Sequence, residues 1–308
     1  MNTEPNEELT KKVTILTGDP TIAVIAEMEL NESGIDEMVG WVGQHRPECL
    51  PDVADTGMDE SFPFARVRAL FPHALSEPSP APLRSMRTLT ANELLVELAG
   101  RTCYHSYGLK AGKKTNKEYI AHTQAGEVKH ASVLYHAKMS FFFGGISRRV
   151  SHEIIRNYVG ADRDEEGSPS QESTRFTHHY GFFIMPPRYL ECAGNSFEMR
   201  ERFECAMQDA YDNYLGAVNS EVAYFKELQG RVPTAIDRKR IYEAASSFLP
   251  HQSETSFIWT SNPMAIAKFC KERDNEAADL EIQRFAKKWK KICVERWPNV
   301  FPQPWMQE

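Results

Sequence analysis

The sequence predicts a mixed α/β (α+β) fold in which short strands are combined with long helices. Several apolar runs have the length of strands, and Gly, Asp or Pro residues bound them. Apolar residues recur at helical spacing from Phe197 to Phe225 and again in the C-terminal region. With 308 residues, of which 41% are hydrophobic and 26% charged, the chain can bury a large core.

The composition excludes several classes of protein. A net charge of -7 argues against a general nucleic-acid-binding protein, which would present a basic face. The 6 cysteines include no CxxC pair, so we expect neither a metal site nor a disulfide framework. The N-terminus is polar, and no apolar run is long enough to cross a membrane. We therefore expect a cytoplasmic protein.

The first third of the chain carries weak signals. We expect residues 1–12 to be disordered, 13–16 to form a strand, and 21–29 to form a strand or a helix. Prolines punctuate residues 34–85, which predicts an irregular surface insertion or an oligomer contact. The chain is therefore divided into 1–89, an N-terminal strand plus irregular extension, and a main domain, 90–308.

The main domain begins with a helix over 90–98, because Thr90 is a good N-cap and Glu93 completes a capping box. A lysine-rich turn at 110–117 then precedes a second helix. The remaining expected elements are strands at 139–143, 180–185 and 255–260, and helices at 146–158, 197–225, 237–248 and about 263–296.

The charged and polar residues that could bind a ligand are concentrated between Ile146 and Phe176. Arg149, Glu153 and Arg156 lie at i, i+4 and i+7, so they share one edge of the expected helix. An acidic loop and a polar cluster of Ser, Thr, Gln and Arg follow. Arginines beside small hydroxyl donors suit a phosphate or a planar heterocycle. The alternative is a solvated helix surface followed by an ordinary loop.

The order of these residues resembles the signature region of the flavin-dependent thymidylate synthases. The matching pieces are Ser147-Arg148, the run His152–Tyr158 and the run Ser170–Phe176. Glu153 stands where that family has Gln, Phe176 replaces Tyr, and Asn157 and Tyr158 replace two members of its Arg-His-Arg triplet. The chain thus resembles a divergent member of the family.

Further blocks extend the resemblance over about 90–301. They are Arg101–Tyr104, His130–His136, the segment ending in Leu249-Pro250, Asn262, and Arg273–Asp279. Ser246 and Met264 stand where the family has Arg. The resemblance implies an antiparallel sheet with long helices, and it makes 90–308 the catalytic domain.

The activity implied by the resemblance is FAD-dependent reductive methylation of uracil C5 in a uridine 5'-monophosphate nucleotide. Methylene-tetrahydrofolate would supply the carbon and NADPH would reduce the flavin. The chain contains no Pro-Cys-His, the source of the thiolate in the other class of thymidylate synthases, and Cys103 and Cys270 are expected to be small buried hydrophobes. The resemblance also implies a homotetramer whose sites are shared between subunits.

The resemblance assigns roles to individual residues. Arg273 and Ser173 are the catalytic candidates, and Glu153, Ser173, Arg175 and Arg273 are expected to bind the substrate. Arg273 would stabilise charge on the pyrimidine ring, unless it is an exposed helix residue paired with Glu276. The residues expected to contact FAD are His130, Arg156, Asn157, Tyr158, Gln171 and Asn262.

Glu153 leads to a hypothesis about the sugar. A carboxylate can accept a hydrogen bond from a ribose 2'-hydroxyl, which favours UMP, as in the branch that serves nucleoside-antibiotic (polyoxin-type) pathways. A dUMP-specific thymidylate synthase is the alternative. An inactive flavin- or nucleotide-binding regulatory protein is the alternative from another class, although Arg156, Ser173, Arg175 and Arg273 argue against it.

Overall fold

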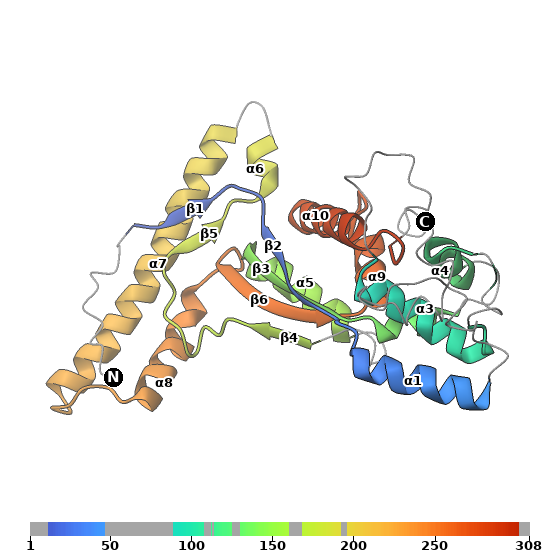
Figure 1. Cartoon of the computed structure of the whole chain (residues 1–308). Helices are drawn as coiled ribbons and strands as arrows, with labels where there is room; N and C mark the ends of the chain where they lie inside the picture. The colour runs from blue at the N-terminus through green and yellow to red at the C-terminus, as the bar shows by residue number, and fades with distance from the viewer. Residues whose placement is uncertain are drawn as a thin grey trace, which may run out of the picture.

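The computed structural model describes residues 12–46, 89–107, 112, 114–124, 130–159, 168–191 and 196–301. Its centre is a four-stranded sheet in which every neighbouring pair is antiparallel (Figure 1). The strands, in spatial order, are β2 (Thr21–Glu27), β3 (Met139–Ser147), β6 (Glu254–Ser261) and β4 (Ser168–Gln171). The predicted α+β class with an antiparallel sheet is therefore confirmed.

A helical lobe lies at one end of this sheet (Figure 1). Strands β1 (Thr14–Leu16) and β5 (Phe182–Ile184) pair in parallel there and lie across the long helix α7 (Ser196–Glu227). The lobe also contains α6 (Pro187–Glu191) and α8 (Ala235–Ala245), which continues as the 3-10 turn η5 (Ser246–Phe248). Buried aromatic residues Phe183, Tyr211 and Tyr214 hold these elements together.

The opposite end of the sheet carries α1 (Glu32–His45), α3 (Ala91–Tyr104), α4 (Asn116–Gln124) and the 3-10 helix η4 (Ala131–His136) (Figure 1). Helix α3 begins as predicted, because Thr90 and Glu93 form both bonds of the capping box. Inside this lobe Glu97 and Arg101 form a fully buried ion pair with a 2.6 Å contact.

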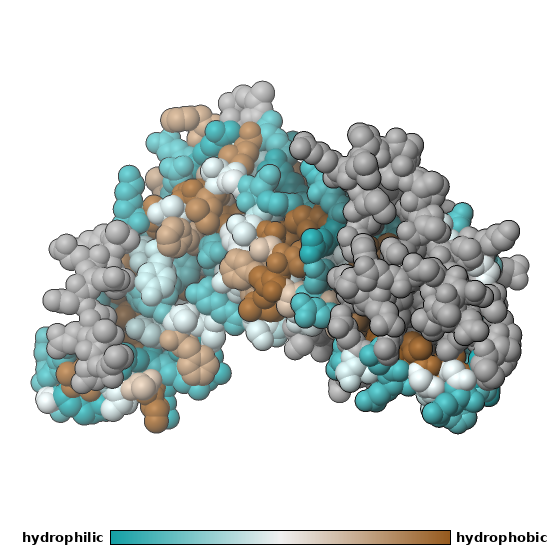
Figure 2. Space-filling view, in the orientation of Figure 1, coloured by the Kyte–Doolittle hydropathy of each residue, from teal (hydrophilic) through white to brown (hydrophobic). Residues whose placement is uncertain are grey.

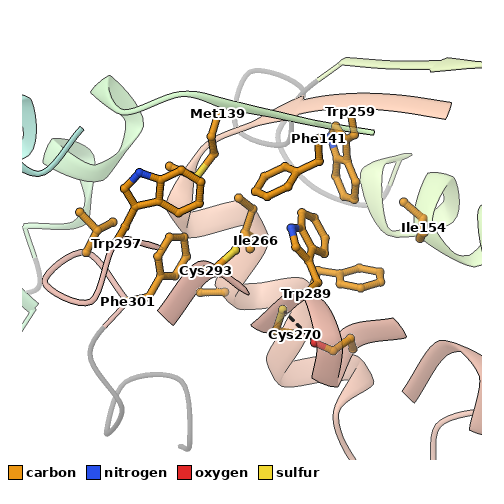
Figure 3. Close-up of a cluster of buried hydrophobic side chains, with 14 of the residues drawn as sticks. Met139, Phe141, Ile154, Trp259, Ile266, Cys270, Trp289, Cys293, Trp297 and Phe301 are labelled. Carbon is orange, nitrogen blue, oxygen red and sulfur yellow. Dashed lines mark hydrogen bonds between the residues drawn. The ribbon is translucent and has the colours of Figure 1, made fainter. Parts of the chain in front are cut away.

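The main core fills one face of the sheet (Figure 3). Alternating residues of β3 and β6 point into it, as the two-residue period of a strand requires. Helices α5 (Arg148–Val159), α9 (Pro263–Arg273) and α10 (Leu280–Arg296) close the core. Trp289 of α10 packs edge-on against Phe141 and Phe143, with ring centroids 5.2 and 5.1 Å apart.

Several local predictions were wrong. The helix expected from Ile146 starts at Arg148, because Ile146 still pairs with Thr255 in the sheet. The single helix expected over 263–296 is two helices, because Asp274 and Asp279 cap the two facing ends. Part of the expected irregular insertion is helix α1, and the polar segment Ser168–Gln171 is a strand. Residues 47–88 and the acidic loop at 160–167 lie outside the described residues.

Two kinds of feature are absent from the described residues. No described helix combines the length and the apolar character needed to span a membrane. Within the same ranges, no group of three or more His, Cys, Asp or Glu side chains could hold a metal ion.

Candidate active site

Helix α5 follows directly from the central strand β3 and positions the signature residues. Its first amides are satisfied by the chain before β6, because Arg148 N–H donates to Ser253 O at 2.9 Å and Arg149 N–H to His251 O at 3.0 Å. Val150 and Ile154 are buried in the main core. The predicted charged edge is therefore turned away from the core.

The charged edge of α5 meets the break between α9 and α10. Glu153 Oε2 lies 3.7 Å from Arg273 Nη1, and both side chains are about three-quarters buried, with 28% and 24% exposed. Arg149 pairs with Asp279. Arg273 is thus not the exposed residue of the alternative interpretation, and its recorded partner is Glu153 rather than Glu276.

The turn after β4 contains the second group of predicted substrate residues. Ser173 Oγ accepts a hydrogen bond from Arg175 N–H at 3.3 Å, so the hydroxyl proton remains available to donate. Arg175 Nε donates to Glu243 Oε2 of α8 at 3.1 Å. The ring of Phe176 lies under Lys239, whose Nζ is 4.7 Å from the ring centroid.

Two residues expected to contact FAD have internal partners. Gln171 Nε2 donates to Ser151 Oγ at 2.8 Å and Thr255 Oγ1 at 3.1 Å, which ties β4 to α5 and β6. Asn262 is buried, and its side chain accepts from Ala265 N–H at 3.0 Å as the N-cap of α9. Both side chains therefore have a structural role in this chain.

The other expected flavin residues are either exposed or have side chains that are not described. His130 is exposed, and its Nε2 is 3.2 Å from the hydroxyl of Tyr104 at the end of α3. Arg156 is exposed in the last turn of α5. The backbones of Asn157 and Tyr158 continue α5, but their side chains lie outside the described part of the structure.

A small pocket lies beside the turn after β4 that contains Ser173 and Arg175, which we call the signature turn. It is lined by Arg148, Glu172, Thr174, Thr177, His178, His179, Tyr214, Leu249 and Glu254. Burial lowers the pKa of Arg148 and raises the pKa of Glu254. Burial also lowers the pKa of His179 to about 4, and the positive charge of Arg148 adds to this effect. The histidine is therefore neutral near pH 7.

In the described part of the chain, two arginines of the candidate site have a side-chain donor without a hydrogen-bond partner. The Nε atoms of Arg148 and Arg273 are buried and have no hydrogen-bond partner among the described residues. A buried donor without a partner is costly, so an acceptor on a bound ligand would stabilise either guanidinium. Planar cationic donors and an exposed His–Tyr pair match the phosphates and ring systems of a flavin nucleotide and a uracil nucleotide. The side chains present thus fit FAD.

The structure brings the predicted residues together in two groups. Glu153 contacts Arg273, and Ser173 contacts Arg175, but no hydrogen bond or ion pair between described residues joins the two groups to each other or to His130. Sequence reasoning missed Lys239 and Glu243. Their i, i+4 spacing, continued by Ser246 at i+7, is the signal that could have indicated a functional face on this helix.

The cysteine prediction was half right. Cys270 is buried in the main core, and burial raises the pKa of its thiol. Cys103 is exposed, because the last turn of α3 extends beyond the core, so it is not the buried hydrophobe that was expected.

Comparison with known proteins identifies relatives over most of the chain. Residues 86–299 match the family model described as "Thymidylate synthase complementing protein". The flavin-dependent thymidylate synthase of Mycolicibacterium vanbaalenii is 33% identical over 208 residues, which cover 67% of this chain and 77% of the relative. That of Corynebacterium diphtheriae is 32% identical over 218 residues, covering 69% and 79% of the two chains.

A solved structure is also similar, at a lower level. It is thymidylate synthase X from Helicobacter pylori with FAD and dUMP, which is 17% identical and has a TM-score of 0.47 over 72% of this chain and 97% of that one. The sequence matches span about two thirds of this chain at about one third identity. They are sufficient to assign the family without the structural similarity. The chain belongs to the thymidylate synthase complementing protein family, and the two relatives given above are named flavin-dependent thymidylate synthases.

Proposed function

We propose that the protein is a flavin-dependent methyltransferase that methylates C5 of a uracil nucleotide 5'-monophosphate. The observation that carries the proposal is Arg273, a largely buried guanidinium whose Nε has no partner among the described residues and whose Nη1 faces Glu153. A cation held in a site with little water is the group that this reaction needs. The names of the relatives supply the reaction class.

The chemistry explains why a buried arginine is needed. Uracil C5 is weakly nucleophilic until negative charge develops on the ring and is stabilised at O4. One preorganised donor at such a position lowers a barrier by about 3–4 kcal/mol. Arg273 is the proposed donor to O4, and Glu153 holds its guanidinium in place. FAD would supply the redox chemistry and carry the one-carbon unit from methylene-tetrahydrofolate, with NADPH as the reductant.

Ser173 and Arg175 are the proposed contacts to the nucleotide phosphate. The Ser173 hydroxyl keeps its proton available to donate, and the Nε and Nη2 of Arg175 both lie 3.1 Å from Glu243 Oε2. A guanidinium can bind two phosphate oxygens at once. His130, Arg156, Asn157, Tyr158 and Gln171 remain the proposed FAD contacts, and a homotetramer with shared sites remains part of the proposal. Asn262, which was also expected to contact FAD, is buried and caps α9.

The substrate sugar has two candidates. The relatives are named thymidylate synthases, which favours dUMP. Glu153 favours UMP, because its carboxylate is only 3.7 Å from Arg273 and an accessible oxygen there can accept from a 2'-hydroxyl. If the carboxylate binds the 2'-hydroxyl, Glu153→Gln should lower the activity with UMP relative to the activity with dUMP.

Tritium release from 5-tritiated dUMP and UMP tests both points. The FAD-loaded protein would receive methylene-tetrahydrofolate and NADPH, and Arg273→Lys would serve as the matched variant. We expect release with the wild type, and roughly a hundred-fold slower release with the variant at unchanged FAD content. Release from neither nucleotide by a protein that retains FAD would refute the proposal and favour a binding protein without turnover.

A further inference from the structure

One face of α8 presents charged side chains to the signature turn. Lys239, Glu243 and Ser246 lie at i, i+4 and i+7, so they form one stripe on the helix. Glu243 binds Arg175, and Lys239 lies over the ring of Phe176. Two contacts therefore place this stripe directly opposite the turn that contains Ser173.

In the described part of the structure, Lys239 contacts an aromatic ring and no carboxylate. The side chain is half-buried, and its recorded contact is with the face of an aromatic ring, a weak attraction. Glu243, the usual partner at i+4, is 3.1 Å from Arg175 instead. Within the described ranges, Lys239 has no ion pair. A half-buried ammonium without an ion-pair partner would be stabilised by a bound anion.

A second cation beside this turn, Arg148, is partly buried, and its Nη2 already donates to Glu172 O at 3.1 Å, so it is less able to move to a phosphate than Lys239. Ser246 carries no charge, and its hydroxyl donates to Glu243 O within the helix at 2.8 Å. Arg175 supplies one positive charge, whereas a nucleotide monophosphate carries between one and two negative charges at neutral pH. Lys239 reaches the same turn from one helical turn earlier than Glu243, and its flexible stem allows the ammonium to leave the Phe176 ring.

We propose that Lys239 binds the 5'-phosphate of the nucleotide together with Ser173 and Arg175, and that Glu243 holds Arg175 until the phosphate replaces it. This inference rests on the proposed function and specifies its phosphate contacts. Glu243 competes with the phosphate for Arg175, so its negative charge lowers nucleotide affinity while keeping the guanidinium oriented.

Binding of dUMP, UMP and deoxyuridine to the full-length, FAD-loaded protein tests the inference. Lys239→Met removes the charge and keeps the stem, Lys239→Arg keeps the charge, and Arg240→Met removes the neighbouring exposed cation on the same helix. Equilibrium dialysis would give the nucleotide affinities, and competition would give that of the nucleoside. Circular dichroism and FAD absorbance would show that each variant is folded.

We expect Lys239→Met to weaken binding of the better nucleotide about ten- to hundred-fold, the effect of one lost charged hydrogen bond, and to leave deoxyuridine within about twofold. Lys239→Arg should retain most of the affinity, Arg240→Met all of it, and Glu243→Gln should bind the nucleotide more tightly. These differences would identify a contact to the phosphate.

Other outcomes overturn the inference in distinguishable ways. Unchanged nucleotide affinity in Lys239→Met removes Lys239 from the phosphate site and leaves the proposed function intact. Equal losses for nucleotide and nucleoside would show a general structural role. If the wild type binds neither nucleotide, the proposed function is refuted and the role of Lys239 falls with it.

Discussion

His179 makes the stability of the protein depend on pH in a predictable way. Its ring is packed against Phe183 and the tyrosines of α7, and its Nδ1 accepts a hydrogen bond from Gly181 N–H at 3.1 Å. Protonation would place a proton on Nδ1 and break this bond. Burial, and then the charge of Arg148, accordingly lower the pKa of His179 to about 4.

The size and sign of the effect follow from proton linkage. The unfolded chain binds a proton at this ring near pH 6.5, whereas the folded protein does so only near pH 4. Between these values the unfolded state holds more protons, so the free energy of unfolding falls as the pH falls. The contribution of the neutral His179 ring to the free energy of unfolding is complete above pH 6.5, and about 2 kcal/mol of that contribution is lost at pH 5.

Urea denaturation of the wild type and His179→Asn at pH 7 and pH 5 measures this contribution. The Asn side chain keeps an acceptor near Gly181 N–H but does not titrate. We expect the wild type to lose about 2 kcal/mol more than the variant between the two pH values. His178 and all carboxylates are common to both proteins, so their titration cancels in the difference. Equal losses in the two proteins would refute the assignment of a buried, neutral His179.

Two further predictions concern buried polar contacts. Glu97→Gln should lower the free energy of unfolding by about 3–5 kcal/mol, because Arg101 is left buried without its charge partner. The double variant Glu97→Leu with Arg101→Met should lose much less stability, because no charge is then left buried. Equal losses for the two proteins in thermal melts would contradict this. Asn262→Ala should cost about 1 kcal/mol through the lost N-cap while FAD absorbance is retained. Loss of FAD from a folded Asn262→Ala protein would instead favour a direct flavin contact.

Elements with local signals could be predicted from the sequence. The capping box of Thr90 and Glu93 involves residues three positions apart, so it is visible without knowledge of the fold. The helix α7 was predicted almost to its ends because its apolar spacing is long and regular. Helix α1 had a usable signal that was missed, since Asn31 caps it and Ile35 and Val42 lie on one face.

Elements defined by distant partners could not be predicted in this way. The segment Ser168–Gln171 is polar and contains Pro169, and it is a strand because it pairs with the edge of β6. The contact between Glu153 and Arg273 joins two helices far apart in the chain, and nothing in either segment specifies it. The resemblance supplied the residues of the candidate site, and the structure supplied their partners.

These partners have a consequence for ligand binding. Each arginine proposed to contact the nucleotide is held by a carboxylate, Arg273 by Glu153 and Arg175 by Glu243. The second pair is about half exposed, and pairs of that kind contribute at most about 1 kcal/mol. A phosphate that binds two oxygens to Arg175 can therefore replace Glu243 at little cost. The less exposed pair of Arg273 and Glu153 should resist such exchange. In the proposed complex, Arg273 would therefore keep its orientation while the phosphate enters at Arg175.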